Sequence, residues 1–391
     1  MSKKIKLILV IIILLVLVFG ILFLCNIYRV RHAKILVDTI DNVEVHSEIK
    51  LSDLIKSING KLITDKAVKT DKIGEKKIKF KYINDDNIKV FYSFKINVVD
   101  TTAPVISEIN TINVLKGSAD NIIQRVFCAD NFDKSPSCTI DGNYDLNEVG
   151  SYNVLFKAVD SANNVATRDI TINVLEKADL KKEETVTYYD DIYSKFKNKN
   201  TAVGLDLSYY QGDIDYDKIK DKVDFVFLRI GYGKNRDNKY VLDSNFKEYI
   251  INFNKLKIPV GVYFFSYDEN IKDAKESAKF VLKNIKKYKI DLPIVYDWEN
   301  FKAFADYNMS LHDLNMMAKT FMNRVQKRGY KTMLYSSKNY LKYAWDDDYT
   351  VWLAHYNENS DYSHLYKMWQ ICDDGKIDGI TSSVDIDIMY K

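Results

Sequence analysis

The chain has 391 residues, of which 47% are hydrophobic and 28% are charged, a balance typical of globular proteins. This length exceeds that of one typical domain and predicts two or three. The formal net charge of +3 is close to neutral, and no basic stripe with interleaved aromatic residues stands out. We therefore expect no nucleic-acid partner.

The N-terminus carries the strongest compositional signal. The run from Leu7 to Cys25 is uncharged and apolar except for Gly20, and as a helix it would be about 28 Å long, close to the thickness of a bilayer's hydrocarbon. A cleaved signal peptide has a shorter apolar region followed by small residues, whereas Asn26 and Ile27 follow here. We therefore expect a cytoplasmic stub and an uncleaved transmembrane helix over residues 1–28. Basic residues flank the run almost equally, so charge alone does not orient it.

Residues 34–176 show short alternating runs separated by polar turns, which is typical of β structure. The segments 73–100 and 149–176 align without a gap, 76 residues apart, so that Gly74 matches Gly150 and Phe80 matches Phe156. The stretches "VDTTAPVI" (99–106) and "GSYNVLFKAVDSANNVAT" (150–167) resemble bacterial Ig-like surface repeats. We expect two Ig-like β-sandwiches, over 34–100 and 101–176. The resemblance implies a spacer or adhesive module without catalysis, with other cell-wall proteins as candidate partners.

Two cysteines lie in the second of these repeats. Cys128 and Cys138 bracket a polar loop, and they would form a disulfide if this part of the chain is outside the cell. Two unpaired thiols are equally consistent with the sequence. We expect no zinc site, because no second pair of cysteines and no nearby histidines complete one.

Residues 177–200 are charged and lack a sustained period, so we expect a linker, with room for one short helix. From residue 201 the pattern changes to alternating strands and helices. Apolar residues spaced by three and four predict helices in 270–289 and 310–329, the latter with Ser310 as N-cap and Gly329 as its stop. Eight apolar runs predict strands: 201–207, 224–230, 259–265, 293–298, 331–336, 350–356, 367–372 and 383–388.

This alternation favours a parallel sheet covered by helices on its outer side. About 190 residues are few for a full (β/α)8 barrel, and the last strands lie too close together for helices between them. We therefore expect residues 201–391 to form a modified, TIM-like but incomplete (β/α) barrel. The fold class is multidomain: a transmembrane helix, two small all-β sandwiches and this barrel.

Acidic residues gather where the strands of the barrel end. Asp206 ends the first strand, Asp297 and Glu299 end the fourth, and Asp385 lies in the last. Catalytic residues of such barrels lie at the C-terminal ends of the strands, and the first and last strands of a closed barrel are neighbours. Strand alternation places residues 297 and 299 on one face, roughly 6.6 Å apart. A solvated strand end explains any one of these acids, but less readily their convergence from three strands.

Aromatic residues belong to the same strand ends. Tyr263, Tyr335 and Trp352 alternate along their strands, as residues that fill a barrel also do. A rim of carboxylates and aromatic faces suits a carbohydrate, because glycoside cleavage generally needs two carboxyl groups.

The motifs of this region resemble those of the glycoside hydrolase family 25 lysozymes, the Chalaropsis-type muramidases. They are "VGLDLSYYQGDIDYDKI", "FVFLRIGYG", "PVGVYFFSY", "PIVYDWEN", "VWLAHY" and "SSVDIDI", and the resemblance covers essentially all of 201–391. It implies cleavage of the β-1,4 bond between N-acetylmuramic acid and N-acetylglucosamine in peptidoglycan, without metal or cofactor. It also implies a catalytic domain outside the cell, and hence a cytoplasmic N-terminus.

By position, the resemblance implies that Glu299 is the proton donor, with Asp297 as its partner and Asp206 and Asp385 as flanking acids. The residues expected to bind substrate are Tyr263, Trp352, Tyr335, Gln370 and Arg229.

Two positions depart from the family's pattern. Some members have a Lys-x-Thr-Glu-Gly motif where this chain has Arg229-Ile230-Gly231-Tyr232-Gly233, and many have Asn at the position of Asp387, whose charge we expect to be peripheral. Inverting and neighbouring-group mechanisms both remain open. The alternative function is a non-catalytic glycan-binding or adhesive surface protein, which the converging acids disfavour.

Overall fold

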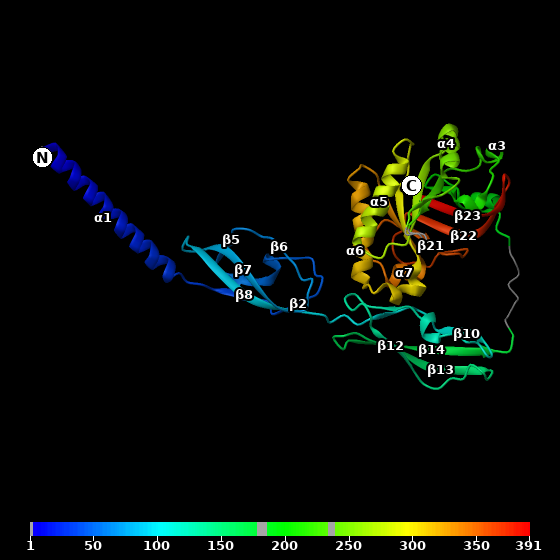
Figure 1. Ribbon diagram of the computed structural model, residues 1–391, viewed down its shortest axis with the longest axis horizontal. Coiled ribbons are helices and arrows are strands. Elements are labelled where there is room, and N and C mark those ends of the chain that lie inside the picture. Colours follow the sequence, from blue (N-terminus) through cyan, green and yellow to red (C-terminus); the bar gives the residue numbers. More distant parts are fainter. Residues whose placement is uncertain (1–2, 178–185, 234–238) are drawn as a thin grey trace. The chain divides into compact units, whose positions relative to one another are not determined.

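The computed structural model describes residues 3–177, 186–233 and 239–391. By its internal contacts the chain divides into two compact units, Met1–Thr101 and Thr102–Lys391. The first unit holds the N-terminal helix and one β domain; the second holds another β domain and the C-terminal barrel (Figure 1).

The N-terminal helix α1 spans Lys3–Arg31. The most apolar 18 residues of its segment Leu7–Arg31 have a mean hydropathy of 3.7, and none of these residues is buried against protein. Its length and composition would let it cross a membrane, and they also fit a signal sequence.

The first β domain is built on the sheet β2–β8–β7–β5. Its long strands are β7 (Gly74–Asn84) and β8 (Lys89–Val99), flanked by β2 (Asn42–Glu44) and β5 (Gly60–Leu62). Two small sheets join β1 (Val37–Thr39) to β4 (Ile55–Ile58), and β3 (Ile49–Lys50) to β6 (Ala67–Val68). Alternate residues of β7 and β8, among them Phe80 and Ile96, are buried, so one face of the sheet supplies the core.

The second β domain repeats this central hairpin. Its sheet has the order β10 (Thr111–Leu115), β14 (Val165–Leu175), β13 (Gly150–Val159), β12 (Ser137–Asp141), and β9 (Val105–Ile106) pairs with β11 (Cys128–Ala129). The two hairpins have one register, because Gly74 opposes Val98 as Gly150 opposes Val174. Residues that are 76 positions apart in the sequence therefore occupy equivalent places in the two hairpins. The assignment of the two domains as Ig-like stays a prediction. Of the alternatives for the cysteine pair, the structure contains the Cys128–Cys138 disulfide.

The second β domain packs directly against the barrel. The Phe127 ring makes edge-to-face contacts with Phe301, Phe304 and Tyr340, at centroid distances of 5.8, 5.4 and 5.4 Å. The backbone amide of Leu311 donates to the carbonyl of Asp130 at 2.8 Å. A module that makes these contacts is not a free spacer.

The described end of the predicted linker, residues 186–200, also packs against the barrel. It contains helix α2 (Tyr189–Phe196), and the buried Tyr189 hydroxyl donates to the carbonyl of Val203 at 2.9 Å. This part of the segment is therefore no free tether; residues 178–185 lie outside the described residues.

Eight strands form the barrel, and all eight coincide with predicted runs. They are β15 (Thr201–Leu207), β16 (Val226–Tyr232), β18 (Val260–Ser266), β19 (Ile294–Trp298), β20 (Thr332–Ser337), β21 (Val351–Ala354), β22 (Met368–Ile377) and β23 (Ile380–Tyr390). The short β17 (Val241–Leu242) lies beside β16.

The eight strands close into a ring, so that the first and last strands are neighbours as expected. Strand β15 pairs with β23 on one side and with β16 on the other. The shortage is in the helices: within the described residues no helix separates β21, β22 and β23, and β23 runs antiparallel to both of its neighbours. Antiparallel strands need only a short turn, so the ring closes with fewer residues.

Helices cover the outside of the barrel. The predicted helices are present as α5 (Ile271–Ile285) and α6 (Leu311–Gln326), which lie side by side in Figure 1. The N-cap prediction is confirmed, because the Ser310 hydroxyl accepts from the amide of Asp313 at 3.2 Å. Helix α6 ends before the predicted stop at Gly329. Sequence patterns did not indicate α3 (Tyr216–Ile219), α4 (Phe246–Leu256) or α7 (Lys338–Tyr343).

Strand alternation divides the barrel's side chains between two cores. One set packs between strands and helices, and the other, which includes Phe227, Val295, Met333 and Trp352, fills the interior. Gly261 makes room for an interior ring, since a Cβ there would lie 2.3 Å from the ring of Phe227. Toward the C-terminal ends of the parallel strands, the interior positions become acidic and polar.

We predict that Phe127→Ala will lower the thermal stability of the Thr102–Lys391 unit. Removing a buried phenylalanine ring costs about 3–5 kcal/mol, and Phe127 is 7% exposed. Differential scanning calorimetry measures the effect, with Tyr144→Ala, an exposed aromatic residue of the same β domain, as the control. Equal, small shifts in both variants would contradict a packed interface.

Candidate active site

The predicted acids meet at one end of the barrel. Asp206 and Asp385 are direct partners across the β15–β23 pair, as expected for first and last strands. Asp297 lies level with Phe265 and Tyr335 on the neighbouring strands. Around the ring, β16 and β18 separate β15 from β19, so the two acidic groups face the same interior from different sides.

A cavity of about 240 Å³ opens at this end. All nine residues that the sequence singled out line it. The complete lining is Asp206, Ser208, Tyr210, Gln211, Arg229, Tyr263, Phe265, Asp297, Glu299, Tyr335, Trp352, Gln370 and Asp385.

Burial dominates the electrostatics of the acids. Asp206 and Asp297 are each 3% exposed. Burial and the negative charge of Glu299 raise the pKa of Asp297 well above its usual range. Burial and the nearby Asp206 raise the pKa of Asp385 to about 10. Burial also raises the pKa of Asp206, although a hydrogen bond from Gln370 opposes the shift. Asp206 is therefore the acid of the β15–β23 pair that more readily carries a charge.

Glu299 is more exposed than the other acids of the cavity. It follows the last residue of β19 and precedes the 3-10 helix η4 (Asn300–Tyr307). Its side chain is exposed at the mouth, yet protein surrounds it on its other sides, and this partial burial raises its pKa. Because Asp297 lies deeper, Glu299 is the first of the two to lose its proton as the pH rises.

A polar scaffold holds Asp206 in place. Gln370 donates from Nε2 to Asp206 Oδ2 at 2.8 Å, and its Oε1 accepts from the hydroxyls of Tyr335 at 2.8 Å and Tyr356 at 2.9 Å. With both ends of its amide occupied and 3% exposure, Gln370 orients the acid and is poorly placed to contact a sugar.

Two of the predicted sugar-binding aromatics form the floor of the cavity. Trp352 is 1% exposed and Tyr335 is 8% exposed, and their rings pack edge to face. The aromatic surface that solvent reaches belongs instead to Tyr209 and Tyr210, whose ring centroids lie 4.1 Å apart. Sequence reasoning missed these two, although the quoted "LSYYQG" contains them, because they lie outside the strands in the short 3-10 helix η3 (Tyr209–Gln211).

The expectation that the charge of Asp387 is peripheral is wrong. It is fully buried beneath the cavity, and Trp352 Nε1 donates to its Oδ1 at 2.9 Å. Burial and the charges of Asp206 and Asp385 raise its pKa well above the usual range. A neutral carboxylic acid here has the same hydrogen-bonding groups, one acceptor and one donor, as the Asn of other members.

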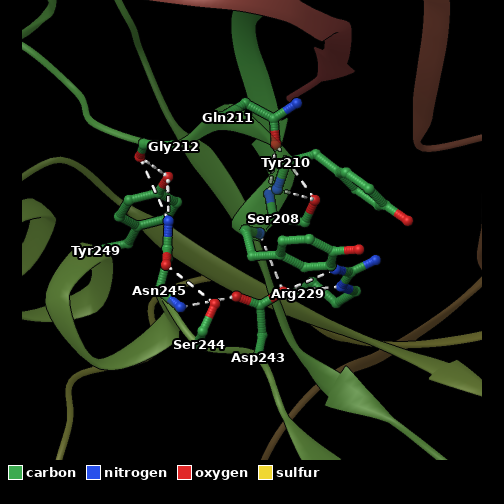
Figure 2. A network of polar contacts seen from close by, with 10 residues as sticks. Ser208, Tyr210, Gln211, Gly212, Arg229, Asp243, Ser244, Asn245 and Tyr249 are labelled. Atoms are coloured by element: carbon green, nitrogen blue, oxygen red, sulfur yellow. Dashed lines mark hydrogen bonds and ion pairs between the residues drawn. The ribbon is translucent and has the colours of Figure 1, made fainter.

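Arg229 lies at the rim of the cavity in an ion pair. Its Nε donates to Asp243 Oδ2 at 2.9 Å, and its guanidinium carbon lies 4.9 Å from the ring centroid of Tyr209 and 5.3 Å from that of Tyr210. Figure 2 shows Asp243 beside Arg229 and next to the segment 208–212. Asp243 also accepts from the amide of Tyr209 at 3.1 Å, so the pair fixes the exposed tyrosines.

The same network anchors the loop to the helix layer. Ser208 and Gln211 form a capping box (Figure 2). Gln211 Nε2 also donates to the carbonyl of Ser383 at 3.0 Å. The Tyr249 hydroxyl of α4 donates to the carbonyl of Gly212. Asp243, Ser208, Gln211 and Phe265 were not predicted, since their roles depend on contacts between segments distant in sequence.

We predict that Asp387→Asn will flatten the pH dependence of stability. The pKa of Asp387 is higher in the folded protein than in the unfolded chain, where it is about 3.9. The stability that protonated Asp387 contributes is therefore fully present below about pH 3.9 and is lost as the pH rises toward the pKa of the folded state. Asparagine keeps an acceptor for Trp352 but binds no proton, so the variant should lose less stability between pH 5 and pH 9. The limit is about 1.4 kcal/mol per pH unit for each group.

Urea unfolding at several pH values measures the slope, with Asp387→Ala as the control. Alanine leaves the buried Trp352 Nε1 unpaired, which costs about 1–3 kcal/mol at every pH. An Asp387→Asn slope identical to that of the wild type would show that Asp387 is ionised in the folded protein.

The C-terminal part of the chain, which contains this site, is similar to known proteins. Residues 205–380, somewhat less than half of the chain, match the family model described as glycosyl hydrolases family 25. The uncharacterized protein YegX of Escherichia coli O6:H1 is 23% identical over 196 residues, which are 48% of this chain and 69% of YegX.

Two solved structures are among those that match this chain. The modular autolysin LytC from Streptococcus pneumoniae, in complex with a synthetic peptidoglycan ligand, is 23% identical with a TM-score of 0.45; the match covers 60% of this chain and 56% of LytC, little more than half its length. The bacterial lysozyme from Streptomyces coelicolor is 18% identical with a TM-score of 0.39, over 49% of this chain and 92% of the lysozyme.

The family match covers the strands that carry Asp206, Asp297 and Glu299 and ends just before Asp385. With its match to glycosyl hydrolases family 25 over residues 205–380, this protein is a glycoside hydrolase.

Proposed function

We propose that the protein is a membrane-anchored N-acetylmuramidase. It cleaves the β-1,4 bond between N-acetylmuramic acid and N-acetylglucosamine in peptidoglycan. The observation that carries the proposal is the pairing of a solvent-accessible Glu299, whose pKa is raised, with the deeply buried Asp297 in one cavity. The match to a glycoside hydrolase family supports it, because cleavage of a glycosidic bond requires a proton donor of this kind.

Glu299 is the proton donor of the proposed reaction. Its raised pKa keeps it protonated in weakly acidic solution, and its place at the mouth lets it reach the glycosidic oxygen. As the bond between the anomeric carbon and this oxygen breaks, the proton of Glu299 moves to the oxygen of the leaving sugar. Asp297, which keeps its own proton to a higher pH, then stabilises the new Glu299 carboxylate by a hydrogen bond.

Asp206 acts on the anomeric carbon in this proposal. It carries charge more readily than Asp385, and its strand lies across the ring from β19. Its carboxylate stabilises the positive charge that develops on the sugar and accepts a proton from the water that adds there. Tyr210, whose ring lies against that of Tyr209, offers a sugar-stacking face at the mouth, and Tyr263 lines the wall.

In this proposal the membrane helix and the β domains position the catalytic barrel at the cell wall. Peptidoglycan lies outside the membrane, so α1 anchors the chain with its N-terminus in the cytoplasm and the barrel on the wall side. The Cys128–Cys138 disulfide supports the external location, since disulfides persist in oxidising compartments.

Glu299→Gln tests the proposed chemistry. The amide cannot donate a proton to the glycosidic oxygen, so release of reducing ends from purified peptidoglycan should fall by roughly 10²–10⁴-fold. Glu276→Gln, on the exposed face of α5, is the matched control and should leave the rate unchanged. Mass spectrometry of the fragments identifies the bond that is cut. Undiminished release by Glu299→Gln would refute the acid assignment, and no release by the wild type would favour the glycan-binding alternative.

The pH dependence gives a separate prediction for the wild type. Because activity requires protonated Glu299, kcat/KM should decline as the pH rises through the raised pKa of this group. Initial rates on soluble wall fragments between pH 4 and pH 9 measure the decline. A rate that rises across this range would contradict a glutamic acid donor.

Deleting residues 1–31 tests the anchor. The full chain should sediment with membranes and resist extraction by salt and carbonate, because an apolar span binds through hydrocarbon burial. The shortened chain should be soluble. Removal of the helix from the full-length protein by a signal peptidase would contradict the anchor.

A further inference from the structure

The exposed face of the hairpin β7–β8 in the first β domain is unusually basic. Ten side chains of these two strands point away from the core, and five of them are lysines while Glu75 is the one acid. Glu75 is paired with Lys95 at 2.8 Å. The lysines are Lys77, Lys79, Lys81, Lys89 and Lys95. The alternation of the strands thus gathers onto one face a basic surface that the linear sequence did not reveal.

The second β domain shows that the fold does not require these lysines. Its hairpin has the same register, so each position has a counterpart 76 residues further on. The ten counterparts carry one lysine, Lys157, and one acid, Asp169. Apolar and uncharged polar residues fill the other eight places. Two hairpins with one architecture therefore differ in the charge of this face, and stability of the strand pairing does not explain the difference.

The basic face is also hollowed. A groove of about 650 Å³ lies over it, lined among others by Lys66, Lys79, Lys81, Lys89, Phe91 and Ile63. Phe91 is 67% exposed, and the Lys81 ammonium lies 4.8 Å from the centroid of its ring. The groove thus combines positive charge with apolar surface in reach of solvent.

The chemistry of the groove selects the kind of ligand. Lysines two residues apart on a strand recur every ~6.8 Å, which gives rows of positive charge rather than one site. The exposed face of the hairpin has no arginine at its ten positions, so it presents point charges instead of the planar fork that pairs with a carboxylate. A groove accommodates a single chain, whereas a bilayer presents a flat surface that cannot enter it.

We propose that this face binds a linear phosphodiester polymer outside the membrane, with phosphates on the lysines and the intervening sugar or polyol units on Phe91 and Ile63. The binding is independent of the catalytic site. This binding would hold the chain beside the anionic polymers of the wall, as a second attachment besides the membrane helix.

The test uses the full chain in nanodiscs of uncharged lipid and measures binding of fluorescently labelled poly(glycerol phosphate) by anisotropy. The variant replaces Lys79, Lys81 and Lys89 by glutamine, which removes three charges from the groove. The matched control replaces Lys272, Lys275 and Lys283 on the exposed face of α5, with the same change in net charge. Thermal unfolding and the rate of wall hydrolysis confirm that both variants are folded.

The groove variant should bind roughly 100-fold more weakly than the wild type, since three lysines at about 1 kcal/mol each near an anionic surface contribute about 3 kcal/mol. Its affinity should also depend less on salt concentration, because fewer counterions are released. The control should match the wild type. Equal loss in both variants, or no binding by the wild type, would overturn the proposal.

Two further arms test the identity of the ligand. If the polymer does not bind but anionic lipid nanodiscs protect Phe91 from labelling or exchange, the face contacts the membrane and the polymer assignment is wrong. Equally tight binding of double-stranded DNA would show a general polyanion site and would also overturn it.

Discussion

The burial of several carboxyl groups at one end of a closed barrel constrains the rest of the catalytic domain. Moving a charged carboxylate away from water is costly unless it is paired, and such groups respond by keeping their protons. Arg229, the cation at the rim, is already paired with Asp243. The remaining acids are instead accommodated by hydrogen bonds, from Gln370 to Asp206 and from Trp352 to Asp387, and by raised pKa values. Most acids of the cavity therefore keep their protons to a higher pH than free carboxyl groups do. Of the two acids at the end of β19, Asp297 is buried and Glu299 is exposed to solvent.

Strand parity made most of this site predictable. Once the run ending in Asp297 is taken as a strand of a barrel, alternation and the closure between first and last strands place Asp297, Asp206 and Asp385 inside the same end. The same rule applied to β7 and β8 would have predicted the basic face, because every second residue from Lys77 to Lys81 is a lysine. That pattern was missed because the charges were counted along the chain and not by face.

Other features depend on contacts that no local pattern encodes. The exposed pair Tyr209 and Tyr210 is fixed by Asp243, more than thirty residues away, through an ion pair with Arg229. The docking of Phe127 onto the aromatic residues after Glu299 joins two domains predicted to be separate. The antiparallel direction of β23 was also missed, since the reversal of a strand leaves no trace in hydrophobic periodicity.

The two β domains contain equivalent hairpins but make different contacts. Their registers are identical, yet one domain packs against the barrel through Phe127 and the other presents lysines and Phe91 to solvent. The chain therefore combines an apolar helix, a basic β domain and a second β domain joined to the catalytic barrel. In the proposed function these parts would bring the barrel to the wall and hold it there.

Carboxyl NMR tests the central claim, that Glu299 holds a proton above the usual pH range. The protein would be labelled with ¹³C at the side-chain carboxyl carbons of glutamate, and the signal of Glu299 assigned by its loss in Glu299→Gln. The account predicts a titration midpoint above the ordinary glutamate value of about 4.3. The midpoint should shift further up when Asp297 is replaced by alanine, because the hydrogen bond by which protonated Asp297 lowers the pKa of Glu299 is then lost. A midpoint at or below the ordinary value would contradict the account.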